Sequence, residues 1–179
     1  VQGRRPDPMT SLDPAEFGRL FADVRRSALR VETLPEYHEP HEADEIRRWR
    51  AGLPPDDTWA SDYAALVRRH TAAGRTWRRI RVVDAPRTEY QRWVADLAAR
   101  VNIPAGERVR LLPRDHPLVP SLRDVWIFDD TATLMSFHHG AFDAAWKIAD
   151  PAEVAALQAL AEQAWEAATP TEQTASSRL

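Results

Sequence analysis

Residues 125–148 read VWIFDDTATLMSFHHGAFDAAWKI, and this stretch decides the fold. Three runs rich in β-branched and aromatic residues follow one another closely, at 125–128, 133–137 and 142–148. The breaks between them, Asp129–Asp130 and His139–Gly140, are short enough for hairpin turns. Strands that are joined so tightly must run antiparallel. The stretch therefore predicts a three-stranded meander near the C-terminus.

Outside the meander, three more runs have the composition of strands, at 28–34, 76–83 and 108–112. Apolar residues three and four positions apart predict five helices, over 14–24, 43–51, 58–72, 86–101 and 151–167. The fourth helix lies between two predicted strands, so these three elements form a possible βαβ unit. We therefore expect an α+β fold, in which helices pack against a mixed, mainly antiparallel sheet.

The length of 179 residues suits one domain with a single core. We assign this α+β domain to residues 11–168. Residues 1–10 are expected to be an arm or vector residue. Residues 169–179 are rich in Thr, Ser and Gln, and we expect a disordered tail there.

The composition disfavours several classes of protein. The chain has no Cys, which removes disulfides, thiol nucleophiles and Cys-based metal sites. No apolar run approaches the ~18 residues that span a bilayer, and no leader opens the chain. We therefore expect a cytoplasmic protein without a membrane partner. A Gly-rich phosphate loop, a Gly-x-Ser-x-Gly elbow and a His-Glu-x-x-His helix are missing, so we expect no cofactor and no metal, and favour a non-enzyme.

An Arg-rich run ends at Arg81, although the net charge of the chain is −3. On a strand, Trp77, Arg79 and Arg81 share one face. We treat them, with Arg75, as candidate binding residues for a small anionic ligand or an acidic partner. Arg beside an aromatic ring also suits nucleic acid, but the acidic net charge makes direct nucleic-acid binding the less favoured alternative. Ion pairs with the acidic final helix are a third interpretation.

Acidic and imidazole groups cluster at the two predicted turns. Asp129 and Asp130 could bind a partner or an ion, or activate a nucleophile, although Asp is also a common turn residue. If the chain is an enzyme, His138 is the candidate acid or base and Asp129 its companion. As neighbours on a strand, His138 and His139 are expected to point to opposite faces, so they cannot chelate one ion together. A His that lines a hairpin turn is the simpler interpretation.

Two other features have structural interpretations. His38 and His41 are three positions apart, but Pro40 disfavours helix before it, so we expect a solvated acidic loop that leads into a helix. The chain has seven Trp, most of which fall on predicted apolar faces. We expect Trp77 or Trp146 to be exposed, as the marker of a pocket or an interface.

Five segments together carry a resemblance to a known family: Ser27–Tyr37, Gly74–Tyr90, Gly106–Arg110, Val125–Asp130 and Asp150–Pro170. They are similar to an actinobacterial family of uncharacterised domains, domain-of-unknown-function family 6879, over residues 11–170. The resemblance implies a small cytoplasmic protein, commonly encoded beside helix-turn-helix regulators and without an enzymatic activity. The sequence departs from the family at His138-His139-Gly140, where Tyr-Asp and a Gly turn are expected.

The order of strands and helices is also similar to that of phospholipase-D-like folds. Their His-x-Lys-x-x-x-x-Asp motif is absent from the sequence, so an active enzyme of that kind is not expected. We expect a non-enzymatic regulatory or interaction module that works with a helix-turn-helix DNA-binding partner. The alternative is a small-molecule enzyme or ligand sensor, with Arg79 or Arg81 in an anion pocket and His138 as acid or base.

Overall fold

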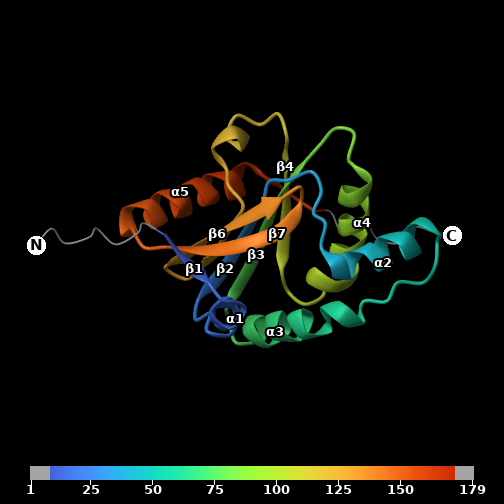
Figure 1. The fold of residues 1–179 in the computed structure, drawn as a ribbon, viewed down its shortest axis with the longest axis horizontal. Coiled ribbons are helices and arrows are strands. Elements are labelled where there is room, and N and C mark those ends of the chain that lie inside the picture. Colours follow the sequence, from blue (N-terminus) through green and yellow to red (C-terminus); the bar gives the residue numbers. More distant parts are fainter. Residues whose placement is uncertain (1–8, 172–179) are drawn as a thin grey trace, which may run out of the picture.

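Eight strands form one mixed sheet in the computed structural model, which describes residues 9–171 (Figure 1). The order of the strands across the sheet is β1-β7-β6-β5-β2-β3-β4-β8. Their bounds are β1 Met9–Leu12, β2 Ser27–Glu32, β3 Thr76–Val83, β4 Arg108–Pro113, β5 Val125–Phe128, β6 Thr131–His138, β7 Ala141–Ile148 and β8 Thr169–Pro170. The strands β2, β3 and β4 are parallel neighbours, and antiparallel strands flank them on both sides. The expected α+β fold with a mixed, mainly antiparallel sheet is confirmed.

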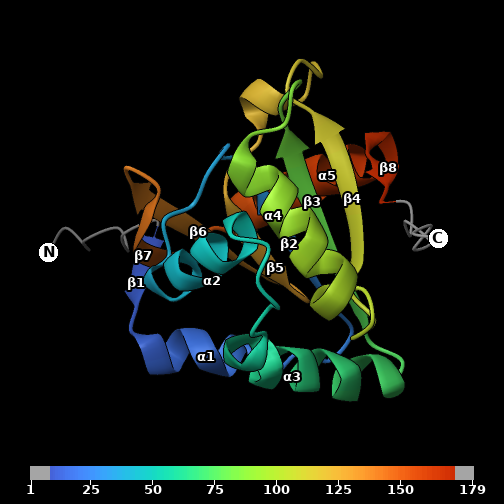
Figure 2. The same ribbon diagram turned by 90° about the vertical axis from the view of Figure 1, so that its right-hand side faces the viewer.

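Five α-helices cover the two faces of the sheet (Figure 2). Their bounds are α1 Pro14–Ala22, α2 Pro40–Arg50, α3 Ser61–Ala72, α4 Glu89–Leu97 and α5 Pro151–Ala167. Short 3-10 helices precede α3 and β5, at Thr58–Ala60 and Val119–Ser121, and a π-helical turn at Ala98–Asn102 prolongs α4. Helices α1 to α4 lie on one face, whereas α5 lies alone on the other (Figure 2). The domain therefore has three layers.

The predicted meander is confirmed, because β5, β6 and β7 are consecutive antiparallel strands. Each of its two turns has two residues between the last paired positions. Asp129 and His139 have φ values of 50° and 48°, and Gly140 has a φ of 82°. Asp, His and Gly are among the residues that adopt this left-handed backbone most readily, which explains why they occupy the turns.

The predicted βαβ unit is also present, since β3 and β4 are parallel and α4 connects them. Helix α4 begins three residues later than predicted because Thr88 caps it: the Thr88 hydroxyl accepts a hydrogen bond from the backbone N–H of Gln91 at 3.1 Å. Helix α2 begins at Pro40, three residues earlier than predicted, since proline suits the first helical turn. His41 therefore belongs to this helix and not to the loop before it.

Two apolar cores lie on opposite faces of the sheet. The core beneath α1, α3 and α4 is rich in aromatic rings, among them Trp77, Trp126 and Phe128. The core beneath α5 consists of aliphatic side chains such as Ile80, together with Trp165 of α5 itself. Alternation of side chains along each strand produces this division. The central strands are therefore covered on both faces.

The first and last described strands form the two edges of the sheet: β1 pairs with β7, and β8 pairs with β4. Residues 9–10 and 169–170 are thus strand residues, although the sequence placed them in the arm and the tail. These edge strands bury almost no side chain, so they leave no apolar pattern to detect. The rest of the predicted arm and tail lies outside the described residues. Among the helices of residues 9–171, none is both long enough and apolar enough to cross a membrane.

Candidate ligand-binding cavity

A buried layer of charged side chains lies on β2 and β3, on the sheet face that α3 and α4 cover. The parallel register of the two strands places Arg30 beside Arg79 and Glu32 beside Arg81. The residues that alternate with them, such as Val31, belong to the core beneath α5. Since successive side chains on a strand point to opposite faces, the four charged side chains face the other helices. We call this group, with its buried carboxylate partners, the charged layer.

Arg79 is buried, and each of its three nitrogens donates a hydrogen bond. Its Nε donates to Glu107 at 2.9 Å, its Nη2 donates to the Tyr63 hydroxyl at 3.0 Å, and its Nη1 donates to Glu32. The second carboxylate oxygen of Glu107 accepts from the Asn102 amide at 2.5 Å. A guanidinium that is paired with two carboxylates has little attraction left for a further anion.

Glu32 connects Arg79 to Arg81. The Nε of Arg81 donates to Glu32 at 2.6 Å, and its Nη1 donates to the backbone carbonyl of Val94 at 3.1 Å. Burial by itself would raise the pKa of Glu32, but the guanidiniums of Arg79, Arg81 and Arg30 outweigh it and lower the pKa to about 2. Glu32 is therefore a fixed negative charge near neutral pH.

Arg30 is balanced by Asp124, the residue before β5, to which its Nη2 donates at 2.9 Å. Asp124 also accepts from the Tyr37 hydroxyl at 2.5 Å and from the backbone N–H of Thr33 at 3.2 Å. The charged layer contains three guanidiniums, those of Arg30, Arg79 and Arg81. It also contains three carboxylates, those of Glu32, Glu107 and Asp124. The formal charge of the layer is therefore zero.

A fourth carboxyl group, that of Glu42, approaches the charged layer from α2. Only 9% of Glu42 is exposed, and the Tyr90 hydroxyl donates to its Oε2 at 3.1 Å. The salt bridges formed within residues 9–171 do not include it. Burial raises the pKa of Glu42 to about 7; the hydrogen bond from Tyr90 opposes the rise and the charge of Glu32 adds to it. Glu42 therefore changes its protonation near neutral pH.

A cavity of about 430 Å³ lies between the charged layer and the helices. Glu32, Glu42, Arg79 and Arg81 provide its charged wall. The rest of the lining is mainly aromatic and aliphatic, and includes Trp59, Tyr63, Tyr90, Val94, Leu97 and Val101. Small-molecule sites in proteins commonly have volumes of roughly 300–1,000 Å³ and this mixture of apolar surface with few polar groups.

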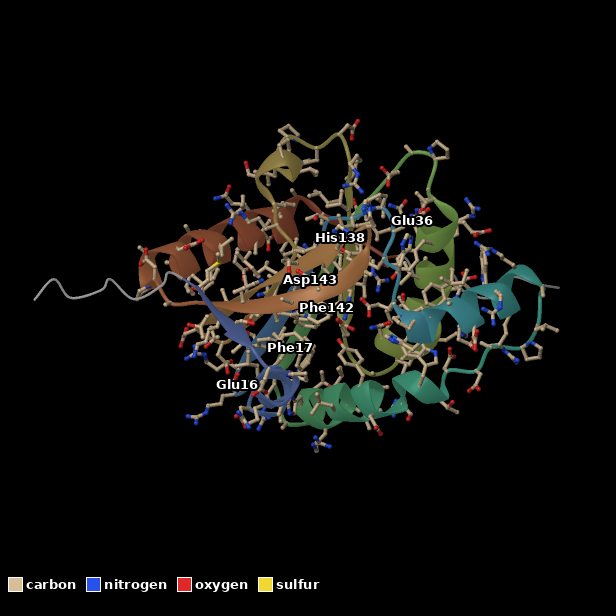
Figure 3. All side chains as sticks on the ribbon, viewed as in Figure 1. Glu16, Phe17, Glu36, His138, Phe142 and Asp143 are labelled. Atoms are coloured by element: carbon tan, nitrogen blue, oxygen red, sulfur yellow. The ribbon has the colours of Figure 1, made fainter. Side chains whose placement is uncertain are left out.

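A second cavity, of about 280 Å³, shares Glu32, Glu42 and Tyr90 with the first. Its lining includes Phe17 and Phe142, which are labelled on the near side of the molecule in Figure 3. The hydrogen bond between Tyr90 and Glu42 therefore belongs to the wall that the two cavities have in common.

One donor in the lining of the larger cavity has no acceptor. The indole Nε1–H of Trp59 is buried and forms no hydrogen bond with the described residues. The Trp59 ring lies beside the ring of His41, with 4.8 Å between the centroids. An unpaired buried N–H destabilises a fold, and this one is enclosed by protein atoms and not open to the cavity.

The structure confirms the shared face of Trp77, Arg79 and Arg81, and places both Arg residues in the cavity wall. Trp77 itself is fully buried in the aromatic core, so the prediction that it could be exposed is wrong. The reason is that β3 is a central strand with helices over both faces. Trp146 is half-buried on β7, and Arg75 is half-buried just before β3; neither lines the two cavities.

The expected ion pair between the Arg-rich run and the final helix is formed by Arg78. Arg78 points towards α5, and its Nη1 donates to Glu162 at 2.8 Å. Because Arg78 and Arg79 are neighbours on a strand, they serve opposite layers of the domain. Arg78 on one side, and Arg79 with Arg81 on the other, thus belong to two separate sets of intramolecular ion pairs.

The two Asp side chains of the predicted pair form intramolecular contacts at the β5–β6 turn. Asp129 accepts hydrogen bonds from the backbone N–H groups of Arg25, Arg26 and Ser27, at 2.8, 2.7 and 2.9 Å. These bonds outweigh the effect of burial and lower the pKa of Asp129. Asp130 is exposed and pairs with the Arg26 side chain at 2.6 Å. Asp129 thus holds the chain before β2 against the turn.

The structure does not bring His138 and Asp129 together, since they flank opposite ends of β6, roughly 20 Å apart for a strand of this length. The prediction that His138 and His139 point to opposite faces is wrong. Their rings are 4.3 Å apart, because His139 has left-handed turn backbone and not strand backbone. Figure 3 shows His138 near Phe142 and Asp143, at the hairpin that joins β6 and β7. His138 lines neither cavity. Within residues 9–171, no group of three metal-ligating side chains is placed to hold an ion.

Comparison with known families now identifies the domain. The sequence profile of a domain of unknown function, DUF6879, matches residues 15–176. The chain belongs to the DUF6879 family. No curated protein matches the sequence.

Solved structures share the fold of this DUF6879 domain at low sequence identity. TrmBL2, an archaeal chromatin protein with a novel mode of DNA binding, has a TM-score of 0.54 at 10% identity over 95% of this chain and 57% of its own. This chain thus spans little more than half of that one. NucT from Helicobacter pylori has a TM-score of 0.54 at 12% identity, over 91% of this chain and 97% of its own. Nuc from Salmonella typhimurium, a phospholipase D family member, has a TM-score of 0.54 at 10% identity, over 91% of this chain and 98% of its own.

Sequence reasoning found two of the cavity's charged residues and missed the others. Glu32 lies at alternate spacing from Arg30 in a run that is otherwise apolar, and this was the available signal for charge on a covered strand face. Glu42 gave no such signal, because it stands in a helix with charged residues on every side. Glu107 and Asp124 lie just before strands and resemble ordinary loop residues.

Proposed function

We propose that this DUF6879 domain is a non-catalytic regulatory module whose larger cavity binds a small organic molecule. The observation that carries the proposal is the cavity of about 430 Å³ between the charged layer and helices α3 and α4. It combines apolar walls with fixed charges. This is the combination by which proteins bind and orient small ligands.

Binding agrees with the geometry better than catalysis does. The candidate acid and base, His138 and Asp129, line neither cavity. Arg79 and Arg81 are already paired with carboxylates, which lowers their attraction for an anionic substrate. Among the described residues, the linings of the two cavities contain no Ser, Thr, Cys or Lys side chain that could act as a nucleophile, and the Tyr63 and Tyr90 hydroxyls are engaged with Arg79 and Glu42.

We further propose that ligand binding is transmitted to a helix-turn-helix DNA-binding partner. Helix α2 is the wall best suited to respond, because its apolar side chains Ile46 and Trp49 pack against the aromatic core while only partly buried. A helix held by partly buried contacts is repositioned more readily than one whose apolar face is fully covered. The occurrence of this fold within a longer archaeal DNA-binding chain supports the same arrangement.

The test of binding is retention of a metabolite by the purified protein, measured by denaturing extraction and mass spectrometry. Val101→Phe fills the cavity, whereas Ala99→Phe places the same ring on the exposed side of the same turn. We expect a bound metabolite in the wild type and in Ala99→Phe but not in Val101→Phe. Re-adding it at about a hundred times its Kd should stabilise the fold by about 2.7 kcal/mol. Equal retention by both variants would contradict the proposal.

The test of the partner uses the same pair of variants. The tagged domain is incubated with a lysate of the source organism, and the bound proteins are identified by mass spectrometry. We expect a stoichiometric helix-turn-helix protein whose recovery differs between Val101→Phe and Ala99→Phe. Equal recovery of the partner by both variants would show that partner binding does not depend on the cavity.

A further inference from the structure

We propose that the larger cavity takes a molecule with a protonated amine and an apolar body, and that Glu42 recognises the amine. This inference rests on the proposed function, because it presupposes that the cavity binds a small molecule. It adds the chemical class of that molecule and the residue that selects it.

The first argument is the charge of the cavity walls. The charged layer is neutral within itself, since three guanidiniums meet three carboxylates. Glu42 is added to this balanced set and has only a Tyr90 hydroxyl as its partner. Ionisation of Glu42 therefore leaves one buried negative charge without a counter-charge, which a cationic ligand would supply. An anionic ligand would instead add a second uncompensated charge.

The second argument is the aromatic character of the same walls. Tyr63, Tyr90 and Trp59 all line the cavity that Glu42 faces. Aromatic faces attract ammonium groups, and the attraction increases when both are removed from water. Aliphatic side chains, among them Leu97 and Val101, then offer the apolar surface that an organic body requires.

The proposed contact has a specific pH dependence. Glu42 must be ionised to bind an ammonium group, and burial raises its pKa to about 7. The groups that face it or share its cavities are the hydroxyls of Tyr90, Tyr37 and Tyr63, the carboxylates of Glu32 and Glu39, the guanidiniums of Arg79, Arg81 and Arg30, and the imidazole of His41. Because the competent fraction scales the apparent affinity, amine binding should strengthen about tenfold from pH 6 to pH 8.

The experiment uses three probes of nearly equal shape: phenethylamine, 2-phenylethanol and 3-phenylpropionate. They carry a positive, a neutral and a negative group on the same body. Binding to the whole chain is followed by the indole N–H resonance of Trp59 in an NMR titration, assigned with Trp59→Phe. We expect phenethylamine to bind most tightly, with an affinity that rises with pH, whereas 2-phenylethanol should show no pH dependence.

Two variants locate the contact. Glu42→Gln keeps the shape of the side chain and removes its charge, so phenethylamine binding should weaken at least about tenfold. Asp44→Asn makes the same change on the exposed side of α2 and should leave the affinity unaltered. The pH dependence of the wild type remains an independent test if Glu42→Gln does not fold.

The outcomes separate this inference from the proposal on which it rests. If 2-phenylethanol or 3-phenylpropionate binds in the cavity as tightly as phenethylamine, Glu42 does not select an amine, while the cavity still binds ligands. If none of the probes moves the Trp59 resonance, the amine assignment is overturned, and the extraction experiment decides separately whether any metabolite is bound. An unchanged affinity in Glu42→Gln would also overturn it.

Discussion

Glu32 and Glu42 line the same cavity, yet their surroundings shift their pKa values in opposite directions. Glu32 stands on a central strand, where the parallel register of β2 and β3 holds guanidiniums against it. Glu42 stands on α2, whose contact with the cavity supplies only a hydroxyl group. Both carboxyls are buried, so burial alone does not determine their behaviour.

The difference teaches that the sheet and the covering helix contribute in different ways. The sheet provides charges that are compensated and fixed, and they give the cavity a permanent shape. The helix provides a carboxyl group that is uncompensated and can change its charge. Near neutral pH, only the charge that the helix provides is expected to change.

The largest expected change in the free energy of unfolding comes from removing a charge of the compensated charged layer. Glu32→Gln leaves Arg79 and Arg81 buried without their shared carboxylate, and should lower the free energy of unfolding by about 3–5 kcal/mol. Urea unfolding measures this change. As a control, Glu162→Gln removes the partner of Arg78 at a more exposed pair and should cost less than about 1 kcal/mol. Equal losses would show that the charged layer behaves as a surface pair does.

Glu42 is the uncompensated carboxyl group, and removing its charge should raise the free energy of unfolding instead of lowering it. The pKa of Glu42 is about 7 in the folded state, against 4.5 for the free side chain. Its stabilising contribution is therefore complete below pH 4.5 and is lost as the pH rises through 7. Glu42→Gln removes this loss, so the variant should gain about 2 kcal/mol over the wild type between pH 5 and pH 8. A constant difference between these pH values would contradict the assignment.

Asp129 is a third kind of carboxylate, because backbone N–H groups donate its hydrogen bonds. Asn at this position retains the left-handed turn but loses the charge and one acceptor oxygen for the N–H groups of Arg25, Arg26 and Ser27. Asp129→Asn should cost about 1–2 kcal/mol in urea unfolding. Metabolite retention should be unchanged, because Asp129 does not line the cavity. Lost retention at wild-type stability would indicate a functional role instead.

The smallest effect should follow removal of the Tyr90 hydroxyl. Its hydrogen bond favours the ionised form of Glu42, so Tyr90→Phe should raise the pKa of Glu42 further. The free energy of unfolding at pH 8 should fall by about 0.5–1 kcal/mol. Carbon-13 NMR of the Glu42 carboxyl group follows the titration directly. A downward shift would show that another group, and not Tyr90, stabilises the charge.

Much of the fold could be predicted from local patterns. The meander follows from short turns between β-rich runs, and the βαβ unit follows from a helix between two strands, because both features depend on neighbours in sequence. The edge strands could not be predicted, since β1 and β8 bury almost nothing. Their positions depend on main-chain pairing with distant residues of β7 and β4.

The candidate site was predicted in part for the same physical reason. Alternation on one strand placed Arg79 and Arg81 on a common face, which the structure confirms. Their carboxylate partners lie on β2 and before β4, so that recognising them requires the order of the strands. The state of Glu42 depends on how deeply α2 buries it, and the highly polar sequence of that helix predicts the opposite.

The pairing of β2 with β5 has a consequence for synthesis of the protein on the ribosome. Strand β2 ends at Glu32, and its antiparallel neighbour begins only at Val125. At translation rates of about 5–20 residues per second, one edge of β2 stays open for roughly 5–20 seconds. During that time Arg30 and Glu32 interrupt a strand that would otherwise be apolar, and such charges discourage pairing with other nascent chains. We therefore expect these two side chains, which line the smaller cavity in the finished protein, to limit aggregation of the nascent chain.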